Sequence, residues 1–154
     1  MVEFRAMKAE DIKKIAELEK LCFSLPWSEQ SLREELTNSC AKYTIGVLDN
    51  EIVAYGGMWI IIDEAHITNV AVSPDHRRKG IAIKLLALMI KEAKNDGVSA
   101  MSLEVRQSNI AAIRLYEQHG FERYGLRKRY YYDNNEDAII MLYKIAQEKT
   151  DLEI

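Results

Sequence analysis

Hydrophobic residues recur along the chain with two periods, and the period changes from one segment to the next. A period near 3.6 predicts amphipathic helices at about 9–22 and 79–95, a third that opens at Asn109, and a short one after Ser28. Alternation of hydrophobic and polar positions predicts strands at 2–6, 42–48, 51–62, 65–73, 101–106, 121–132 and 138–145. On the first helix we expect one buried side, made of Ile12, Ile15, Ala16, Leu18, Leu21 and Cys22.

Short polar signals mark where these elements end. Ser28 is a typical N-cap residue, and the helix after it should run to about Asn38. Asp49-Asn50 is a hairpin signal, and Gly120 suits the end of the helix that opens at Asn109. The resulting order, β-α-α-β-β-β-α-β-α-β-β, predicts a mixed sheet that carries helices. We expect residues 1–147 to form one domain, followed by a frayed tail at 148–154.

Composition excludes several classes of protein. The 154 residues are 48% hydrophobic and 29% charged, a balance typical of a globular domain large enough to bury a core. A formal charge of −3 does not favour nucleic acid as the main partner. The longest apolar run, Met58 to Ile62, is far shorter than the roughly 20 residues that cross a bilayer, and the charged N-terminus is unlike a secretory signal. We therefore expect a cytoplasmic protein without a membrane or nucleic-acid partner.

The cysteines and histidines give no sign of a metal site. Cys22 and Cys40 lack the spacing of metal ligands, and the three histidines are scattered over turns and strands. No Ser/His/Asp or Cys/His set suggests a covalent nucleophile. We expect a reducing compartment and no metal cofactor.

The first chemically informative stretch begins at Val70-Ala71-Val72, a strand that leads through a basic loop directly into a helix. Free N–H groups in the first turn of a helix point at one place and carry the positive end of its dipole. Gly80 and the small Ala82 let a ligand approach the backbone closely. The pattern predicts a cradle for a pyrophosphate, built from Arg77, Arg78, Lys79, Gly80, Ile81, Ala82 and Ile83.

Two other interpretations fit the same residues. A solvated basic helix start would look alike, and a small nucleic-acid patch is a third option, although the chain is acidic overall. The run from Arg77 to Ala82 nevertheless resembles the Gln/Arg-x-x-Gly-x-Gly/Ala signature of the GNAT superfamily of N-acetyltransferases, with alanine at the last position. In that family the cradle binds the pyrophosphate of coenzyme A. The preceding strand residues, here Val70, Ala71 and Val72, pair through their backbone with the pantetheine arm.

A second stretch, from Leu103 to Phe121, extends this resemblance. Its run Asn-x-x-Ala-x-x-Leu-Tyr-x-x-x-Gly-Phe starts at Asn109 and is similar to GNAT enzymes. With Leu-Glu-Val-Arg before it and Asp137-Ala138-Ile139-Ile140-Met141 near the end, it resembles the RimI-type ribosomal-protein alanine N-acetyltransferases over nearly all of residues 2–145. The resemblance implies an α/β (α+β) fold, with a mixed, mostly antiparallel central sheet of about seven strands and about four flanking helices. It also implies acetyl-CoA as cosubstrate and the N-terminal alanine of ribosomal protein S18 as acceptor.

Acetyl transfer from a thioester to an amine needs a proton acceptor, a stabiliser of the carbonyl oxygen and a proton donor for the departing thiolate. Strand alternation turns Glu104 away from its hydrophobic neighbours, so its carboxylate could accept a proton, directly or through a water. Tyr116 has a hydroxyl with an ordinary pKa of about 10 and could protonate the sulfur. Backbone N–H groups near 70–72 are the expected oxyanion donors.

The resemblance assigns the same base and acid roles to Glu104 and Tyr116, and it makes Asn109 a coenzyme contact. Each residue also has an ordinary structural interpretation. A glutamate in a strand often faces solvent only, and a tyrosine on an apolar helix is often a core residue.

The cost of deprotonation bears on the choice of amine. At pH 7 an α-amine costs about 1.4 kcal/mol to deprotonate and a lysine about 4.6 kcal/mol, so one ordinary carboxylate suits an N-terminal amine better. Two segments should shape the acceptor groove, 23–28 with Trp27 and 127–132 with Tyr131, although tyrosines on a hairpin are also ordinary cross-strand packing. A lysine, a polyamine or another small amine stays open as acceptor, and so does a non-catalytic CoA-binding module.

Overall fold

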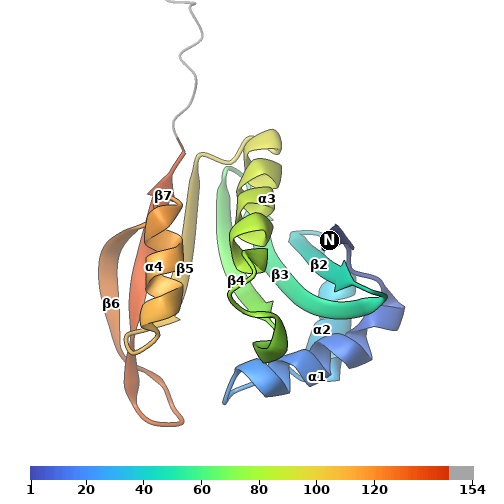
Figure 1. Ribbon diagram of the computed structural model, residues 1–154. Helices are drawn as coiled ribbons and strands as arrows, with labels where there is room; N and C mark the ends of the chain where they lie inside the picture. The colour runs from blue at the N-terminus through green and yellow to red at the C-terminus, as the bar shows by residue number, and fades with distance from the viewer. Residues whose placement is uncertain (146–154) are drawn as a thin grey trace, which may run out of the picture.

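The helices and strands follow the predicted order (Figure 1). The computed structural model describes residues 1–145. Its α-helices are α1 (Ile12–Cys22), α2 (Glu29–Leu36), α3 (Ile81–Asn95) and α4 (Ile110–Gln118), and short 3-10 helices at Ala9–Asp11 and Pro74–His76 precede α1 and α3. Its strands are β1 (Glu3–Ala6), β2 (Ala41–Leu48), β3 (Glu51–Ile61), β4 (Glu64–Val72), β5 (Ala100–Arg106), β6 (Glu122–Tyr131) and β7 (Glu136–Lys144).

This architecture confirms the predicted mixed fold, with two corrections. The helix predicted from residue 79 begins at Ile81, because Arg78 (φ 64°) and Gly80 (φ 75°) have left-handed backbone angles that cannot continue into a right-handed helix. The prediction that Leu21 lies on the buried side of α1 was wrong, since Leu21 is 66% exposed and Glu19 is 1% exposed. The predicted boundary at 147 and the tail at 148–154 lie outside the described residues.

The capping and turn signals act as the sequence predicts. The Ser31 N–H donates to Ser28 Oγ at 3.1 Å, which caps α2. Asp49 (φ 50°) and Asn50 (φ 66°) both have positive φ, as in the type I′ turns that match the twist of a hairpin. These local features fix the pairing of β2 with β3, but not the pairing of strands that are distant in the sequence.

The sheet is divided where β4 meets β5. The strand order is β1-β2-β3-β4-β5-β7-β6, and every neighbouring pair is antiparallel except β4 with β5. That parallel pair holds only from Glu64 opposite Ala100 to His66 opposite Ser102. Just beyond, Thr68 is an extra residue in β4, a bulge that bends a strand away from its neighbour. The two strands then part, as Figure 1 shows.

Each face of the sheet has its own core. The first, on the α3/α4 face, joins side chains of α3 and α4 to Leu103 and Val105 of β5. The second, on the α1/α2 face, joins Ile15 of α1 and Leu32 of α2 to Tyr55 of β3. No helix within residues 1–145 is long and apolar enough to span a bilayer. The two faces of the sheet meet at the gap between β4 and β5.

Close packing in β3 gives a test of this fold. A Cβ added at Gly57 would lie 2.1 Å from Cε1 of Tyr43, whose buried ring is held by a 2.9 Å hydrogen bond from its hydroxyl to Glu35. We predict that Gly57→Ala lowers the free energy of unfolding by about 1–3 kcal/mol, because the ring cannot yield without distortion. Urea denaturation measures the change. Gly125→Ala is the control, since its Cβ would meet Ile140 at an ordinary 3.5 Å, and equal losses in both variants would contradict this packing.

Candidate active site

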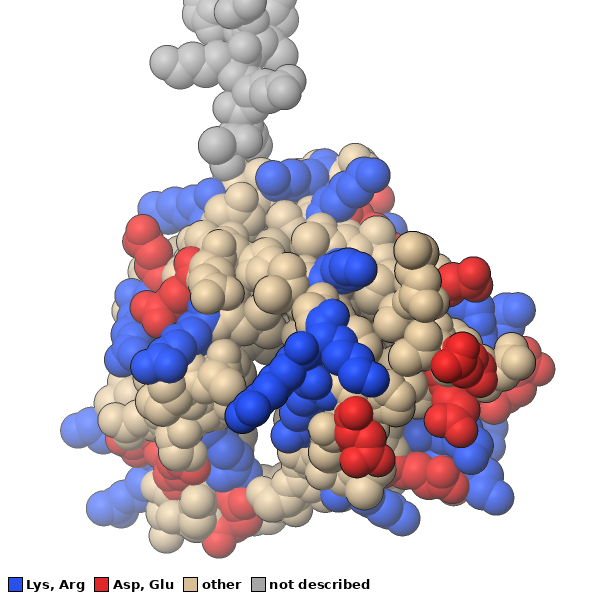
Figure 2. Space-filling view, in the orientation of Figure 1, with Lys and Arg blue, Asp and Glu red and all other residues tan. Residues whose placement is uncertain are grey.

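A pocket of about 210 Å³ lies where β4 and β5 part. Its walls come from the segment between α1 and α2, from β4, β5 and α4, and from the end of β6. Figure 2 shows Lys and Arg side chains gathered around a hollow on the α3/α4 face. This volume is smaller than that of most ligand pockets, so the pocket could hold the reacting ends of two molecules but not a whole coenzyme. The predicted site residues that line the pocket are Trp27, Val70, Glu104, Asn109, Tyr116 and Tyr131.

Glu104 reaches this pocket from the α1/α2 face. Its neighbours Leu103 and Val105 belong to the core on the opposite face, so strand alternation turns the carboxylate the other way. Oε1 lies 3.3 Å from Nε of Arg127, an ion pair that the sequence did not predict. Oε2 is buried and has no hydrogen-bond partner among the described residues. A buried acceptor without a partner is costly, so an N–H donor entering the pocket would be bound there.

Tyr116 approaches the same pocket from the α3/α4 face. The residue is 7% exposed, and its ring packs edge-on against Phe121 with 5.7 Å between the centroids. Burial raises the pKa of the Tyr116 hydroxyl well above its usual value. The hydroxyl is protonated at neutral pH, as an ordinary tyrosine also is, and the raised pKa makes it a weaker acid than a free tyrosine. The carboxylate and the phenol therefore enter the pocket from opposite faces of the divided sheet.

The start of α3 offers a set of free backbone donors. The first hydrogen bond inside the helix runs from Lys84 N–H to the Gly80 carbonyl oxygen at 3.2 Å, and Gly80 has no side chain to cap the turn. The N–H groups of Ile81, Ala82 and Ile83 are thus left without a partner in the helix, as at any helix N-terminus. The space beside Gly80 is open, because an added Cβ would meet no atom within 4 Å. These features fit the diphosphate of the predicted cosubstrate.

The side chains of the cradle differ in what they can contact. Ile81 is 3% exposed and belongs to the core, so only its N–H can serve a ligand, whereas Ile83 is 49% exposed. The Arg77 guanidinium donates to the Val72 carbonyl oxygen at 3.2 Å and to Cys22 Sγ at 3.7 Å. Arg77 therefore braces the loop, and Arg78 and Lys79 remain exposed on the loop that leads into the helix.

The backbone of β4 has one open edge next to the pocket. The Ser73 N–H donates to Val53 of β3 at 2.8 Å, and residues that bond a partner alternate along an antiparallel pair. Ala71 therefore bonds β3 as well, while Val70 and Val72 turn their N–H and C=O groups to the edge that β5 has left. The Val72 carbonyl already accepts from Arg77. Of the three predicted backbone contacts, Val70 and Val72 face the opening, and Ala71 does not.

Asn109 lines the pocket and also caps a helix. Its side-chain oxygen accepts a 3.2 Å hydrogen bond from the Ala112 N–H and caps α4, the helix that carries Tyr116. The side-chain NH₂ group is left to donate to a ligand.

Two buried polar residues of the pocket escaped the sequence analysis. Glu19 accepts from the Trp27 N–H at 2.8 Å and from the Tyr55 hydroxyl, and burial raises the pKa of its carboxyl group. Asn69 directs its NH₂ group to Glu19 at 3.5 Å, which leaves its buried oxygen Oδ1 without a partner among the described residues. Glu19 was detectable, because it lies four residues after Ile15 on the buried side of α1. Asn69 gave no such signal.

Comparison with known proteins identifies the family. The model of the acetyltransferase (GNAT) family matches residues 12–121. The chain belongs to the GNAT family of acetyltransferases. A relative from Bacillus subtilis is 39% identical over 138 residues, with 89% of this chain and 91% of the relative aligned. The ribosomal protein bS18-alanine N-acetyltransferase of Escherichia coli K12 is 34% identical, with 92% and 96% aligned.

Structural similarity agrees with the sequence comparison. The crystal structure of the ribosomal-protein-S18-alanine N-acetyltransferase from Escherichia coli superimposes with a TM-score of 0.91 at 32% identity, and the match covers 100% of both chains. The predicted reaction class, acetyl-CoA-dependent N-acetyl transfer, is thereby confirmed. Within residues 1–145 no group of three or more His, Cys, Asp or Glu side chains could hold a metal ion.

The open space beside Gly80 leads to a matched pair of variants. Gly80→Val should weaken acetyl-CoA binding about tenfold or more, because the new side chain would occupy the space in front of the free N–H groups. Isothermal titration calorimetry measures the affinity. Gly97→Val is the control at the other end of α3, where φ is 81° and the Cβ position is also open. Equal affinities for the two variants would show that the cradle does not bind the coenzyme.

Proposed function

We propose that this GNAT enzyme transfers the acetyl group of acetyl-CoA to the N-terminal α-amine of a protein, and that its acceptor is the N-terminal alanine of ribosomal protein bS18. The names of the relatives from Escherichia coli support the acceptor, because the match spans nearly the whole of both chains. One structural observation carries the proposal. A carboxylate with a free oxygen and a protonated phenol enter one pocket from opposite faces of the sheet.

The proposed proton transfers follow from this arrangement. Glu104 Oε2 takes a proton from the incoming ammonium, directly or through a water, and the neutral nitrogen then attacks the thioester carbonyl carbon. The Val70 N–H, on the open edge of β4, stabilises the carbonyl oxygen as it gains negative charge. Tyr116 donates its proton to the sulfur as the carbon–sulfur bond breaks, and the nitrogen gives its second proton to the resulting Tyr116 phenolate, directly or through a water. The amide and the free thiol of coenzyme A are the products.

Asn69 extends the acceptor side of this scheme. Its Oδ1 and Glu104 Oε2 are both buried, both without a partner among the described residues, and both in residues that line the pocket. An α-ammonium carries three donors and can satisfy two such acceptors at once. Alternation along β4 and β5 places both side chains on the α1/α2 face, where we expect the acceptor to enter.

The energetics favour an α-amine over a lysine. Deprotonation at pH 7 costs about 3 kcal/mol more for lysine, which corresponds to a rate factor of roughly 10² at equal binding. The acceptor peptide would then lie between Trp27 and Tyr131, which both line the pocket and come from the α1–α2 segment and the end of β6. Both remain proposed substrate contacts.

Two further assignments remain proposals. We place the enzyme in the cytoplasm, because Cys22 and Cys40 are both free, as expected of a reducing compartment. We also assign residues 1–147 to a single acetyltransferase domain, since the described residues share one sheet.

A panel of acceptors tests the function directly. We predict that intact-mass spectrometry will detect one added acetyl group on a peptide with the bS18 N-terminus. The same peptide with a blocked N-terminus, a lysine whose α-amine is acetylated and a polyamine should react at least about tenfold more slowly. Preferential acetylation of lysine or polyamine would contradict the proposed acceptor, and turnover of none would favour a CoA-binding module.

Loss of the carboxylate should separate chemistry from binding. We predict that Glu104→Gln lowers kcat by about 10²-fold or more, because the amide cannot accept the ammonium proton, and that it leaves the Kd for acetyl-CoA unchanged. Stopped assays of the alanine peptide and calorimetry supply the two values. Glu122→Gln, an exposed glutamate on β6, is the control. Unchanged turnover of Glu104→Gln would remove Glu104 as the base.

A further inference from the structure

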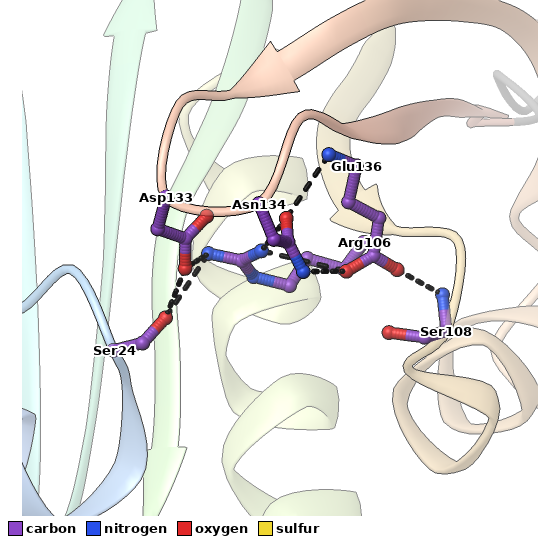
Figure 3. A network of polar contacts seen from close by, with 6 residues as sticks. All are labelled: Ser24, Arg106, Ser108, Asp133, Asn134 and Glu136. Carbon is purple, nitrogen blue, oxygen red and sulfur yellow. Dashed lines mark hydrogen bonds and ion pairs between the residues drawn. The ribbon is translucent and has the colours of Figure 1, made fainter.

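Arg106, the last residue of β5, gathers a polar network at the mouth of the pocket (Figure 3). Its Nη2 donates to Asp133 Oδ2 at 2.9 Å and to Ser24 Oγ at 3.2 Å, and the Ser24 hydroxyl donates to the same Asp133 oxygen at 2.6 Å. Its Nη1 donates to Asn134 at 3.3 Å and to Glu136 at 3.4 Å. One guanidinium therefore holds two carboxylates, a hydroxyl and an amide.

The network joins segments that are far apart in the sequence. Ser24 belongs to the segment between α1 and α2, which also carries Trp27, while Asp133 and Glu136 belong to the β6–β7 hairpin, directly after Tyr131. The Arg106 guanidinium also stacks over the Tyr131 ring, 4.0 Å from its centroid. Both proposed walls of the acceptor groove thus meet at one side chain.

The same network reaches the helix that carries the proposed acid. The Ser108 N–H donates to Glu136 Oε2 at 2.6 Å, directly before the Asn109 cap of α4. Hydrogen bonds from Ser108 lower the pKa of the Glu136 carboxyl group, and those from Ser24 and Arg106 lower that of Asp133. Both carboxylates are therefore ionised at neutral pH, so their ion pairs with Arg106 are present there.

We propose that Arg106 is a positioning residue for the acceptor, which holds the segment between α1 and α2 against the β6–β7 hairpin and thereby pre-forms the groove that binds the substrate N-terminus. The inference rests on the proposed function, because it concerns the same acceptor site. Arg106 acts through Trp27 and Tyr131 and takes no part in proton transfer. Its side chain is 22% exposed, so solvent screens the ion pairs only in part.

Pre-organisation affects binding more than chemistry. Arg106→Gln should raise the KM for an alanine-starting peptide about tenfold, since several hydrogen bonds to charged groups are lost, while kcat at saturating peptide and the Kd for acetyl-CoA change less than about twofold. Arg106→Lys should restore part of the loss, because a lysine keeps the charge but not the planar fork. Arg123→Gln, an exposed arginine on β6, is the matched control.

Two substitutions that remove fewer contacts than Arg106→Gln test the proposal with less risk of unfolding the protein. Ser24→Ala and Asp133→Asn each remove one side of the bridge, so each should raise the peptide KM, and the double variant should raise it by less than the product of the single effects. Amide hydrogen exchange followed by mass spectrometry should show faster exchange in both 23–28 and 132–136 for Arg106→Gln.

The outcomes separate the two proposals. A raised peptide KM with unchanged kcat and coenzyme affinity supports the positioning role. Faster exchange with an unchanged KM overturns it, and so does a parallel loss of kcat, peptide KM and coenzyme affinity, which indicates a structural role alone. If the wild-type enzyme acetylates another amine instead of the peptide, the proposed acceptor fails. The KM for that amine then tests Arg106 by the same criteria.

Discussion

The parallel pairing of β4 with β5 stops after three residue pairs, and the pocket between these strands depends on that interruption. The Thr68 bulge turns β4 aside at the point where the pairing ends. The backbone groups of Val70 and Val72 that would otherwise bond a neighbouring strand are left for a ligand. A regular sheet would have satisfied them and would have kept the two faces separate. The pocket exists because an edge is exposed in the middle of the sheet.

The division of the sheet also separates the two groups to which proton transfer is proposed. Glu104 lies on the α1/α2 face and Tyr116 on the α3/α4 face, so an amine and a thioester can approach from different sides and meet in the opening. Burial has opposite consequences for the two groups. It raises the pKa of the Tyr116 hydroxyl, and it leaves one Glu104 oxygen without a hydrogen-bond partner among the described residues.

Hydrogen bonds and ion pairs link the segments of the proposed acceptor side, whereas hydrophobic packing supports the proposed coenzyme side. Glu19 fixes the backbone at Trp27 from within α1, and Arg106 ties the same segment to the β6–β7 hairpin. The coenzyme side rests on the core beneath α3, into which Ile81 is packed. Hydrogen bonds are directional, so a few of them can set the spacing of two loops that share little buried surface.

The sequence alone determined the order of the elements, the glycine that leads into α3 and the direction in which Glu104 points, because each of these depends on neighbours a few residues away. It misjudged the buried side of α1, where hydrophobicity favoured Leu21 and the polar partners of Glu19 outweighed it. It began α3 two residues early, since residue type does not reveal the left-handed angle at Arg78. Only the tertiary structure decided that Glu104 and Tyr116 share a pocket, that Ala71 faces β3, and that Arg106 joins the α1–α2 segment to the β6–β7 hairpin. Those facts arise from contacts between segments that are far apart in the sequence, such as Ser24 with Asp133. A local sequence pattern does not show which distant strands pair or where their pairing ends.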